Sequence, residues 1–187
     1  MRARAWFAIG LVILLLAAAG LWLHSRSTQY DEIIARAAAR YDVDFYLVKA
    51  LVYEESWFRP NIRGASGELG LMQVTMKAAA DFTSRNGFPP INEERLLDPR
   101  LNIEVGCWYL RQSLDRYKNS PVPILFALLR YNAGEARADN WLQVAMSRPA
   151  PAGASPEDYY LSLVNFPTTR DYVRRILRRS RIRNYWF

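Results

Sequence analysis

An uninterrupted apolar segment at residues 6–23 constrains this chain more than any other feature of its sequence. As an α-helix that rises about 1.5 Å per residue, the segment would cover roughly 27 Å, which is close to the thickness of a bilayer core. Trp6 and Trp22 lie near its two ends, where the interface between lipid and water favours aromatic side chains. The sequence therefore predicts an N-terminal transmembrane helix.

Two arginines before the apolar segment bear on its orientation. Arg2 and Arg4 favour a cytoplasmic N-terminus, which places everything after the segment outside the cytoplasm. A cleaved signal peptide is the alternative, with small residues at 17–19, but the apolar region of such a peptide is usually only about 7 to 15 residues long. We therefore favour an uncleaved anchor at residues 1–24, followed by an exported domain at residues 25–187.

The exported part of the chain is basic. The full chain has 25 Lys and Arg residues against 18 Asp and Glu residues, and residues 1–24 contain only two of the basic ones. This balance suits an anionic polymer or an anionic lipid surface. Nucleic acid is disfavoured as a partner because the domain is predicted to be exported, and the sequence indicates neither protein partners nor an oligomeric state.

One cysteine and one histidine limit the chemistry of the chain. Cys107 cannot form an intrachain disulfide, and a lone thiol cannot build a thiolate zinc site. His24 lies beside the apolar segment, so the domain lacks an imidazole for a serine, cysteine or metal mechanism. The sequence therefore predicts no metal and no cofactor, and catalysis must depend on carboxylates, hydroxyls, amides or lysines.

The pattern of apolar residues after the anchor is that of helices, with few strand signals. Residues 59–74 are expected to form a loop, with at most a short hairpin near residues 61–70, and the proline-rich residues 149–156 form a second loop. The sequence therefore predicts a mainly α-helical single domain. Its expected helices cover residues 31–40, 42–58, 99–118, 123–130 and 135–146, with two more that begin at residues 75 and 168.

A glutamate interrupts the apolar face of the second of these helices. Leu47, Leu51, Glu55 and Phe58 are spaced so that they project from one side of the helix. A carboxyl group on an apolar face loses hydration of its charged form, so its pKa rises and it can hold a proton near neutral pH. Such a group is what a general acid at a glycosidic oxygen requires.

Two alternatives accompany this interpretation of Glu55. Glu54 lies about 100° around the helix and is expected to point to solvent, where a neutral acid is not maintained. The alternative for Glu55 itself is an edge carboxylate paired with an arginine. The helix alone does not decide between these roles, and the remaining motifs of the chain do.

A glycine-rich segment precedes a candidate sugar-binding amide. Residues 64–70 carry three glycines, but they are spaced three apart and no Lys-Ser or Lys-Thr pair follows, which argues against a phosphate-binding loop. These glycines are better explained by a sharp turn or by a close approach of backbone to a ligand. Gln73, just after them, carries a neutral amide that can hydrogen-bond sugar hydroxyls or an acetamido group.

Four short motifs follow one another along residues 31–178. They are Glu55-Ser56, Gly70-Leu71-Met72-Gln73, Tyr131-Asn132-Ala133-Gly134 and Tyr172-Val173. Each motif is weak alone, but in this order they resemble the catalytic domain of the soluble lytic transglycosylases. Asn102-Ile103, Gly106 and Tyr109-Leu110 also fit the pattern of that family.

The resemblance implies a lysozyme-like helical fold and a bacterial cell-envelope enzyme whose catalytic domain lies in the periplasm. It implies that Glu55 is the single catalytic acid and base and that the chain cleaves the β-1,4 linkage between N-acetylmuramic acid and N-acetylglucosamine in peptidoglycan, with a 1,6-anhydromuramyl product. The residues that it implies for substrate binding are Ser56, Met72, Gln73, Tyr131, Asn132 and Tyr172.

Three positions depart from the pattern of the family. The serine often found nine positions after the glutamate is Gly64, the methionine two positions after the glutamine is Thr75, and a late glutamate is Thr168. Ser66 or Thr75 is a candidate for a replacement hydroxyl. Two alternatives stay open, which are a lysozyme-type hydrolase and a tethered glycan-binding protein with little turnover. The possible second carboxylates of the hydrolase are Glu68, Glu93, Glu94 and Asp98, although acidic residues are more often solvated or capping.

Overall fold

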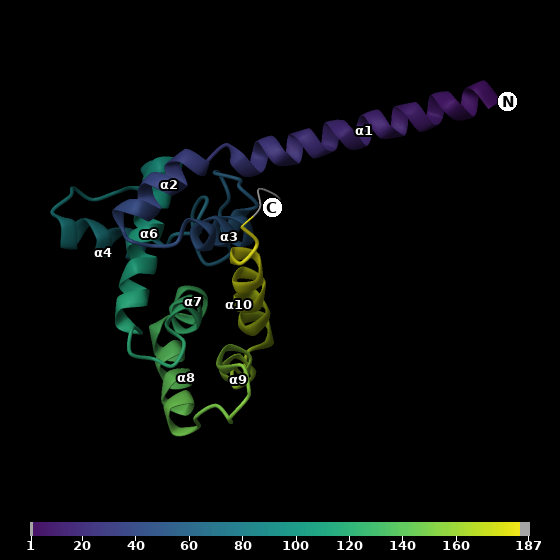
Figure 1. Ribbon diagram of the computed structural model, residues 1–187. Helices are drawn as coiled ribbons and strands as arrows, with labels where there is room; N and C mark the ends of the chain where they lie inside the picture. The colour runs from purple at the N-terminus through teal and green to yellow at the C-terminus, as the bar shows by residue number, and fades with distance from the viewer. Residues whose placement is uncertain (1, 184–187) are drawn as a thin grey trace.

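The computed structural model describes residues 2–183 and is mainly α-helical, as the sequence predicts. Its longest helix, α1 (Arg2–Thr28), projects away from the other helices (Figure 1). By length and composition, this is the one helix of the described chain that is able to cross a membrane, and its apolar part is not buried against the domain. A signal sequence has the same properties, so the choice between anchor and signal peptide stays a prediction. The helix also continues four residues past residue 24, where the sequence predicts that the anchor ends.

The remaining helices form one domain around a shared core. They are α2 (Asp31–Arg40), α3 (Phe45–Ser56), α4 (Met76–Asn86), α5 (Glu93–Leu96), α6 (Pro99–Arg116), α7 (Pro123–Ala133), α8 (Glu135–Ser147), α9 (Pro156–Ser162) and α10 (Pro167–Ser180). Helix α3 packs against α2 and α10, while α7 packs against α6, α8 and α10. The sequence predicts neither α5 nor α9, and α7 runs three residues beyond its expected end.

Helix α3 is fixed at both ends. The Asp44 side chain caps its first turn by accepting a hydrogen bond of 2.9 Å from the Leu47 backbone N–H. At its other end, Trp57 and Phe58 both have left-handed backbone angles, with φ of 53° and 58°, so the chain turns away sharply after Ser56. The predicted apolar face of this helix is confirmed, because Leu47, Val48, Leu51 and Val52 are buried. This geometry leaves Glu55 in the last helical turn, at the edge of the core.

The segment that follows α3 forms a compact turn structure. Isolated antiparallel bridges join Arg63 to Leu69 and Leu69 to Val74, so the expected short hairpin is present and extends to residue 74. Leu69, Leu71 and Val74 are buried, which anchors the segment on the core. Thr75 then caps α4 through its hydroxyl, which accepts a 3.1 Å hydrogen bond from the Ala78 N–H.

The side chain of Asn102 in α6 binds the backbone of this segment. Its side-chain amide donates hydrogen bonds of 2.8 Å to the carbonyls of Leu69 and Leu96, and its side-chain oxygen accepts one of 2.8 Å from the Met72 N–H. A side chain on Gly70 would lie 2.4 Å from the amide nitrogen of Asn102, and one on Gly106 would lie 2.4 Å from the sulfur of Met72. The two glycines therefore permit a close approach of the turn to α6.

Asn102→Ala should destabilise the protein by about 2 to 4 kcal/mol, because it removes three buried hydrogen bonds and leaves the Met72 N–H and the Leu96 carbonyl without a partner. Thermal or urea unfolding measures the effect. Asn140→Ala, which removes an exposed asparagine from α8, is the matched control and should change stability by less than about 0.5 kcal/mol. Equal stability of the two variants would contradict a structural role for Asn102.

Candidate active site

A cleft of about 370 Å³ opens beside the last turn of α3. Its wall is formed by the hairpin segment, the start of α4, the middle of α6 and the end of α7. Polar and aromatic side chains predominate in this wall, which suits a hydroxyl-rich ligand. The residues that line it are Glu55, Glu68, Gln73, Val74, Thr75, Ala78, Tyr109, Arg130, Tyr131, Asn132 and Gly134.

Glu55 is half-buried in this cleft and is held by α10. The Tyr172 hydroxyl donates a hydrogen bond of 2.5 Å to its carboxyl oxygen. Burial raises the pKa of Glu55 to about 7, the hydrogen bond from Tyr172 opposes this rise, and the charges of Glu54 and Glu68 add to it. The group can therefore hold a proton at neutral pH and release it with little cost, as the sequence predicts.

Glu54 is not the solvated carboxylate that the helical spacing predicts. Its side chain is only 13% exposed and forms an ion pair of 2.6 Å with Arg175, with Arg179 at 3.8 Å. The prediction is wrong because α10 packs against α3 and covers this face of the helix. Glu54 and Glu55 therefore contact different kinds of partner on α10, a guanidinium for the first and a neutral hydroxyl for the second.

The positions of Gln73 and Tyr131 are set by hydrogen bonds to backbone. The Gln73 side-chain amide donates to the Gly70 carbonyl at 2.9 Å, and Gln73 itself has a left-handed φ of 46°. Within residues 2–183 its side-chain oxygen accepts no hydrogen bond, so it is available to a ligand donor. The Tyr131 hydroxyl donates to the Met72 carbonyl at 2.8 Å, which joins α7 to the turn.

The other predicted substrate-binding residues differ in whether they line the cleft. Asn132 is exposed and lines the cleft with Gln73 and Tyr131. Ser56 and Met72 do not line it, because their side chains are buried, at 1% and 0% exposure, and offer no surface to a sugar. Tyr172 is also buried; it does not line the cleft, and its hydroxyl contacts the carboxyl group of Glu55.

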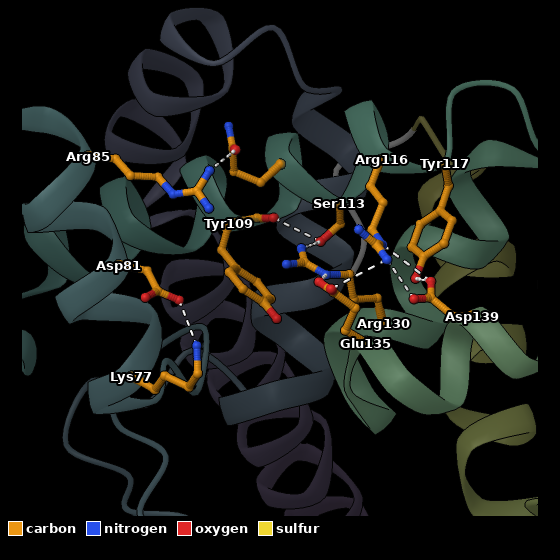
Figure 2. Close-up of polar contacts among 11 residues, drawn as sticks. Lys77, Asp81, Arg85, Tyr109, Ser113, Arg116, Tyr117, Arg130, Glu135 and Asp139 are labelled. Atoms are coloured by element: carbon orange, nitrogen blue, oxygen red, sulfur yellow. Dashed lines mark hydrogen bonds and ion pairs between the residues drawn. The ribbon is translucent and has the colours of Figure 1, made fainter.

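The cleft includes a cation that the sequence did not single out. Figure 2 shows Arg130 held between Ser113 and Glu135, with hydrogen bonds of 2.6 Å and 3.0 Å. Its guanidinium also stacks over the ring of Tyr109, with 4.5 Å to the ring centroid. Tyr109 fits the family motif, but an aromatic residue in the middle of a helix is normally core. Only the tertiary structure brings these side chains to the cleft.

The three departures from the family pattern have different consequences. Thr75 lines the cleft, and its hydroxyl serves as the cap of α4. Thr168 is exposed in the first turn of α10 and does not line the cleft. Gly64 lies directly beneath the Glu68 side chain, since a β-carbon at this glycine would be 2.3 Å from a carboxylate oxygen of Glu68.

A family model described as Transglycosylase SLT domain matches residues 32–151. The chain belongs to this family. It is 27% identical over 161 residues to the soluble lytic murein transglycosylase of Salmonella typhimurium, covering 84% of this chain and 24% of that protein. It is 29% identical over 126 residues to the membrane-bound lytic murein transglycosylase F of Desulfosudis oleivorans, covering 66% of this chain and 26% of that protein.

The fold comparison agrees with the family. The inactive glutamate-to-glutamine mutant of the lytic transglycosylase Slt from Pseudomonas aeruginosa superposes with a TM-score of 0.70 at 25% identity, covering 82% of this chain and 23% of that one. The domain therefore has the lysozyme-like helical fold of the SLT family. The chain spans about a quarter of the length of the relatives that it matches.

The raised pKa of Glu55 has a consequence for stability. The folded protein favours the protonated form, so this contribution is fully present below a pH of about 4.5 and is lost as the pH rises through about 7. Glu55→Gln is neutral at every pH and keeps an oxygen that accepts from Tyr172. We expect it to be more stable than the parent at pH 8 by about 1 to 2 kcal/mol, allowing for partial solvent screening.

Thermal unfolding at pH 4.5 and pH 8 measures this effect. The advantage of Glu55→Gln should be near zero at the lower pH and appear at the higher one. Glu94→Gln, at an exposed position of α5, should show no such difference. A pH-independent effect of Glu55→Gln would mean that folding does not change the pKa of the Glu55 carboxyl group.

Proposed function

We propose that this domain is a peptidoglycan lytic transglycosylase. It cleaves the β-1,4 linkage between N-acetylmuramic acid and N-acetylglucosamine and leaves a 1,6-anhydromuramyl end. The observation that carries the proposal is a half-buried Glu55, with its pKa raised to about 7, in a polar cleft beside Gln73 and Tyr131. Membership of the SLT family supports the same assignment.

The first step is proton donation. Protonated Glu55 gives its proton to the glycosidic oxygen as the bond from that oxygen to the muramyl anomeric carbon breaks. The N-acetylglucosamine leaves with a hydroxyl group, and positive charge develops on the muramyl ring. Tyr172 holds the carboxyl group in place during this transfer, because its hydroxyl donates to one oxygen and leaves the other oxygen to carry the proton.

The second step closes the anhydro ring. The Glu55 carboxylate takes the proton of the muramyl C6 hydroxyl, whose oxygen attacks the anomeric carbon of the same sugar. Because nucleophile and electrophile belong to one ring, the effective molarity of the attack is about 10⁵ M or more, which removes the need for a second carboxylate that activates water. The proton returns to Glu55, and the enzyme is ready for another cycle.

Residues of the cleft wall bind the glycan in this scheme. The free side-chain oxygen of Gln73 accepts from a sugar hydroxyl or acetamido N–H, and Asn132 offers both a donor and an acceptor at the exposed edge. Tyr131 contributes its ring to the wall, because its hydroxyl is already used by the Met72 carbonyl. These assignments keep Gln73, Tyr131 and Asn132 from the predicted substrate contacts and omit Ser56, Met72 and Tyr172.

The anchor and the location form part of the same proposal. Helix α1 spans the inner membrane, and the domain from about residue 25 lies in the periplasm, where the glycan strands are. The length of α1, the arginines before its apolar part and the similarity to a membrane-bound relative support this arrangement. A cleaved signal peptide would deliver the same domain to the same compartment without the tether.

Product analysis tests the proposed activity. The full chain should release muropeptides from purified peptidoglycan that carry anhydromuramyl ends, and mass spectrometry distinguishes these from reducing ends, which are heavier by one water. Glu55→Gln should reduce release by about 10³-fold or more, while Glu94→Gln should not. Equal release by Glu55→Gln and the parent would remove Glu55 from the mechanism, and a majority of reducing ends would favour the hydrolase alternative.

A further inference from the structure

Glu68 is the second carboxylate of the cleft, and the proposed mechanism does not use it. It belongs to the hairpin segment, and its side chain lines the same cleft as Glu55 and Gln73. Its position is fixed by backbone contacts, since the Gly64 N–H donates to the Glu68 carbonyl at 2.7 Å and the Ser66 N–H donates to its carboxylate at 3.0 Å. The side chain is half-buried.

The charge of Glu68 is not neutralised by a neighbouring cation. Many of the glutamates in this chain pair with arginine, including Glu54 with Arg175 and Glu135 with Arg130. Among residues 2–183, no lysine or arginine forms an ion pair with Glu68. A carboxylate that only tied down a surface turn would normally be solvated. This one faces a cleft that also holds a protonated acid, so its field acts on whatever binds there.

The departure at Gly64 makes room for this carboxylate. A β-carbon at residue 64 would lie 2.3 Å from an oxygen of Glu68 and 2.7 Å from the side-chain oxygen of Gln73. The serine that the family pattern places here would therefore collide with the Glu68 side chain. The glycine at 64 and the glutamate at 68 are thus a matched pair, in which the carboxylate occupies the space next to Gln73 that a side chain at residue 64 would take.

We propose that Glu68 is a second catalytic carboxylate, whose negative charge stabilises the positive charge that develops on the muramyl anomeric carbon when Glu55 protonates the leaving oxygen. The proposal rests on the proposed function of the same cleft. Glu68 forms no covalent bond and moves no proton in this role. Its charge is already present before the reaction, so it stabilises the transition state without reorganisation. The same charge also favours the protonated form of Glu55, which raises its pKa.

Glu68→Gln in the full chain is the first test, because glutamine keeps the oxygen that accepts from the Ser66 N–H and removes only the charge. We expect kcat to fall by about 10-fold or more, with a smaller change in KM. The loss of activity on the alkaline side, which reports deprotonation of Glu55, should move to lower pH. Glu94→Gln is the control and should change neither. An unchanged rate and an unchanged pH profile of Glu68→Gln would overturn the proposal and leave Glu68 as a turn residue.

A double-mutant cycle tests the pairing with residue 64. Gly64→Ser should lower the activity of the parent because it displaces the Glu68 carboxylate, and it should have little further effect on the Glu68→Ala variant, where the space is empty. Thermal unfolding of each variant checks that the fold is kept. An equal loss from Gly64→Ser in both backgrounds would show that Glu68 is not what the new side chain displaces, and would contradict the proposal.

Direct titration of Glu55 separates this inference from the proposed function. Carbon-13 NMR of the full chain, with labelled glutamate and Glu55→Gln to assign the signal, follows the Glu55 carboxyl without any turnover. Its pKa should be lower in Glu68→Gln than in the parent. An unchanged pKa would overturn the coupling even if the parent is active. A lowered pKa in Glu68→Gln, together with a parent that releases no anhydro products, would count against the proposed function alone.

Discussion

The chemistry of this protein depends on one carboxyl group, Glu55, that is kept partly out of water. Burial is the largest contribution to its raised pKa, and burial here is a product of packing between two helices that lie far apart in the sequence. Helix α10 places Tyr172 against Glu55 and Arg175 against the neighbouring Glu54. Two adjacent carboxyls of α3 are thereby given opposite electrostatic environments. Glu54 forms an ion pair with a guanidinium, whereas Glu55 contacts a neutral hydroxyl and is able to hold its proton.

The rest of the cleft depends on the backbone turn before Gln73, which is held by hydrogen bonds from two helices. Asn102 binds the turn from α6, and the Tyr131 hydroxyl binds the Met72 carbonyl from α7. Gly70 and Gly106 are small because the turn and α6 approach too closely for side chains at these positions. Motif residues that span about sixty positions of the sequence therefore act together to hold the turn that places Gln73 in the cleft. This explains why several of them do not line the cleft.

The sequence predicted what local patterns encode. The apolar face of α3 and its interruption at Glu55 follow from spacing within one helix, and the structure confirms them. The contacts of Glu54 could not be predicted, because they depend on how α10 docks on α3. For the same reason a family motif could not separate Gln73, which faces the cleft, from Met72 and Ser56, which are buried behind it.

Helices α5 and α9 were missed for a different reason. Each is short, with four and seven residues, and such helices are too short to be stable by themselves. Side-chain caps from Asn92 and Ser155 and burial of Leu96, Tyr160 and Leu161 stabilise them in the folded domain. Without a full turn-by-turn apolar pattern, they resemble loops in the sequence.

The glycine at residue 64 departs from the family motif, and the structure shows what lies beside it. In the sequence, the absence of a side chain at this position suggests a loss of function. In the structure its space is occupied by the carboxylate of Glu68, four residues further along the same turn. A carboxylate therefore lies beside Gln73 and in the same cleft as Glu55. Because a charge acts over several ångströms, this carboxylate contributes to the electrostatics of the cleft without contacting every residue that lines it.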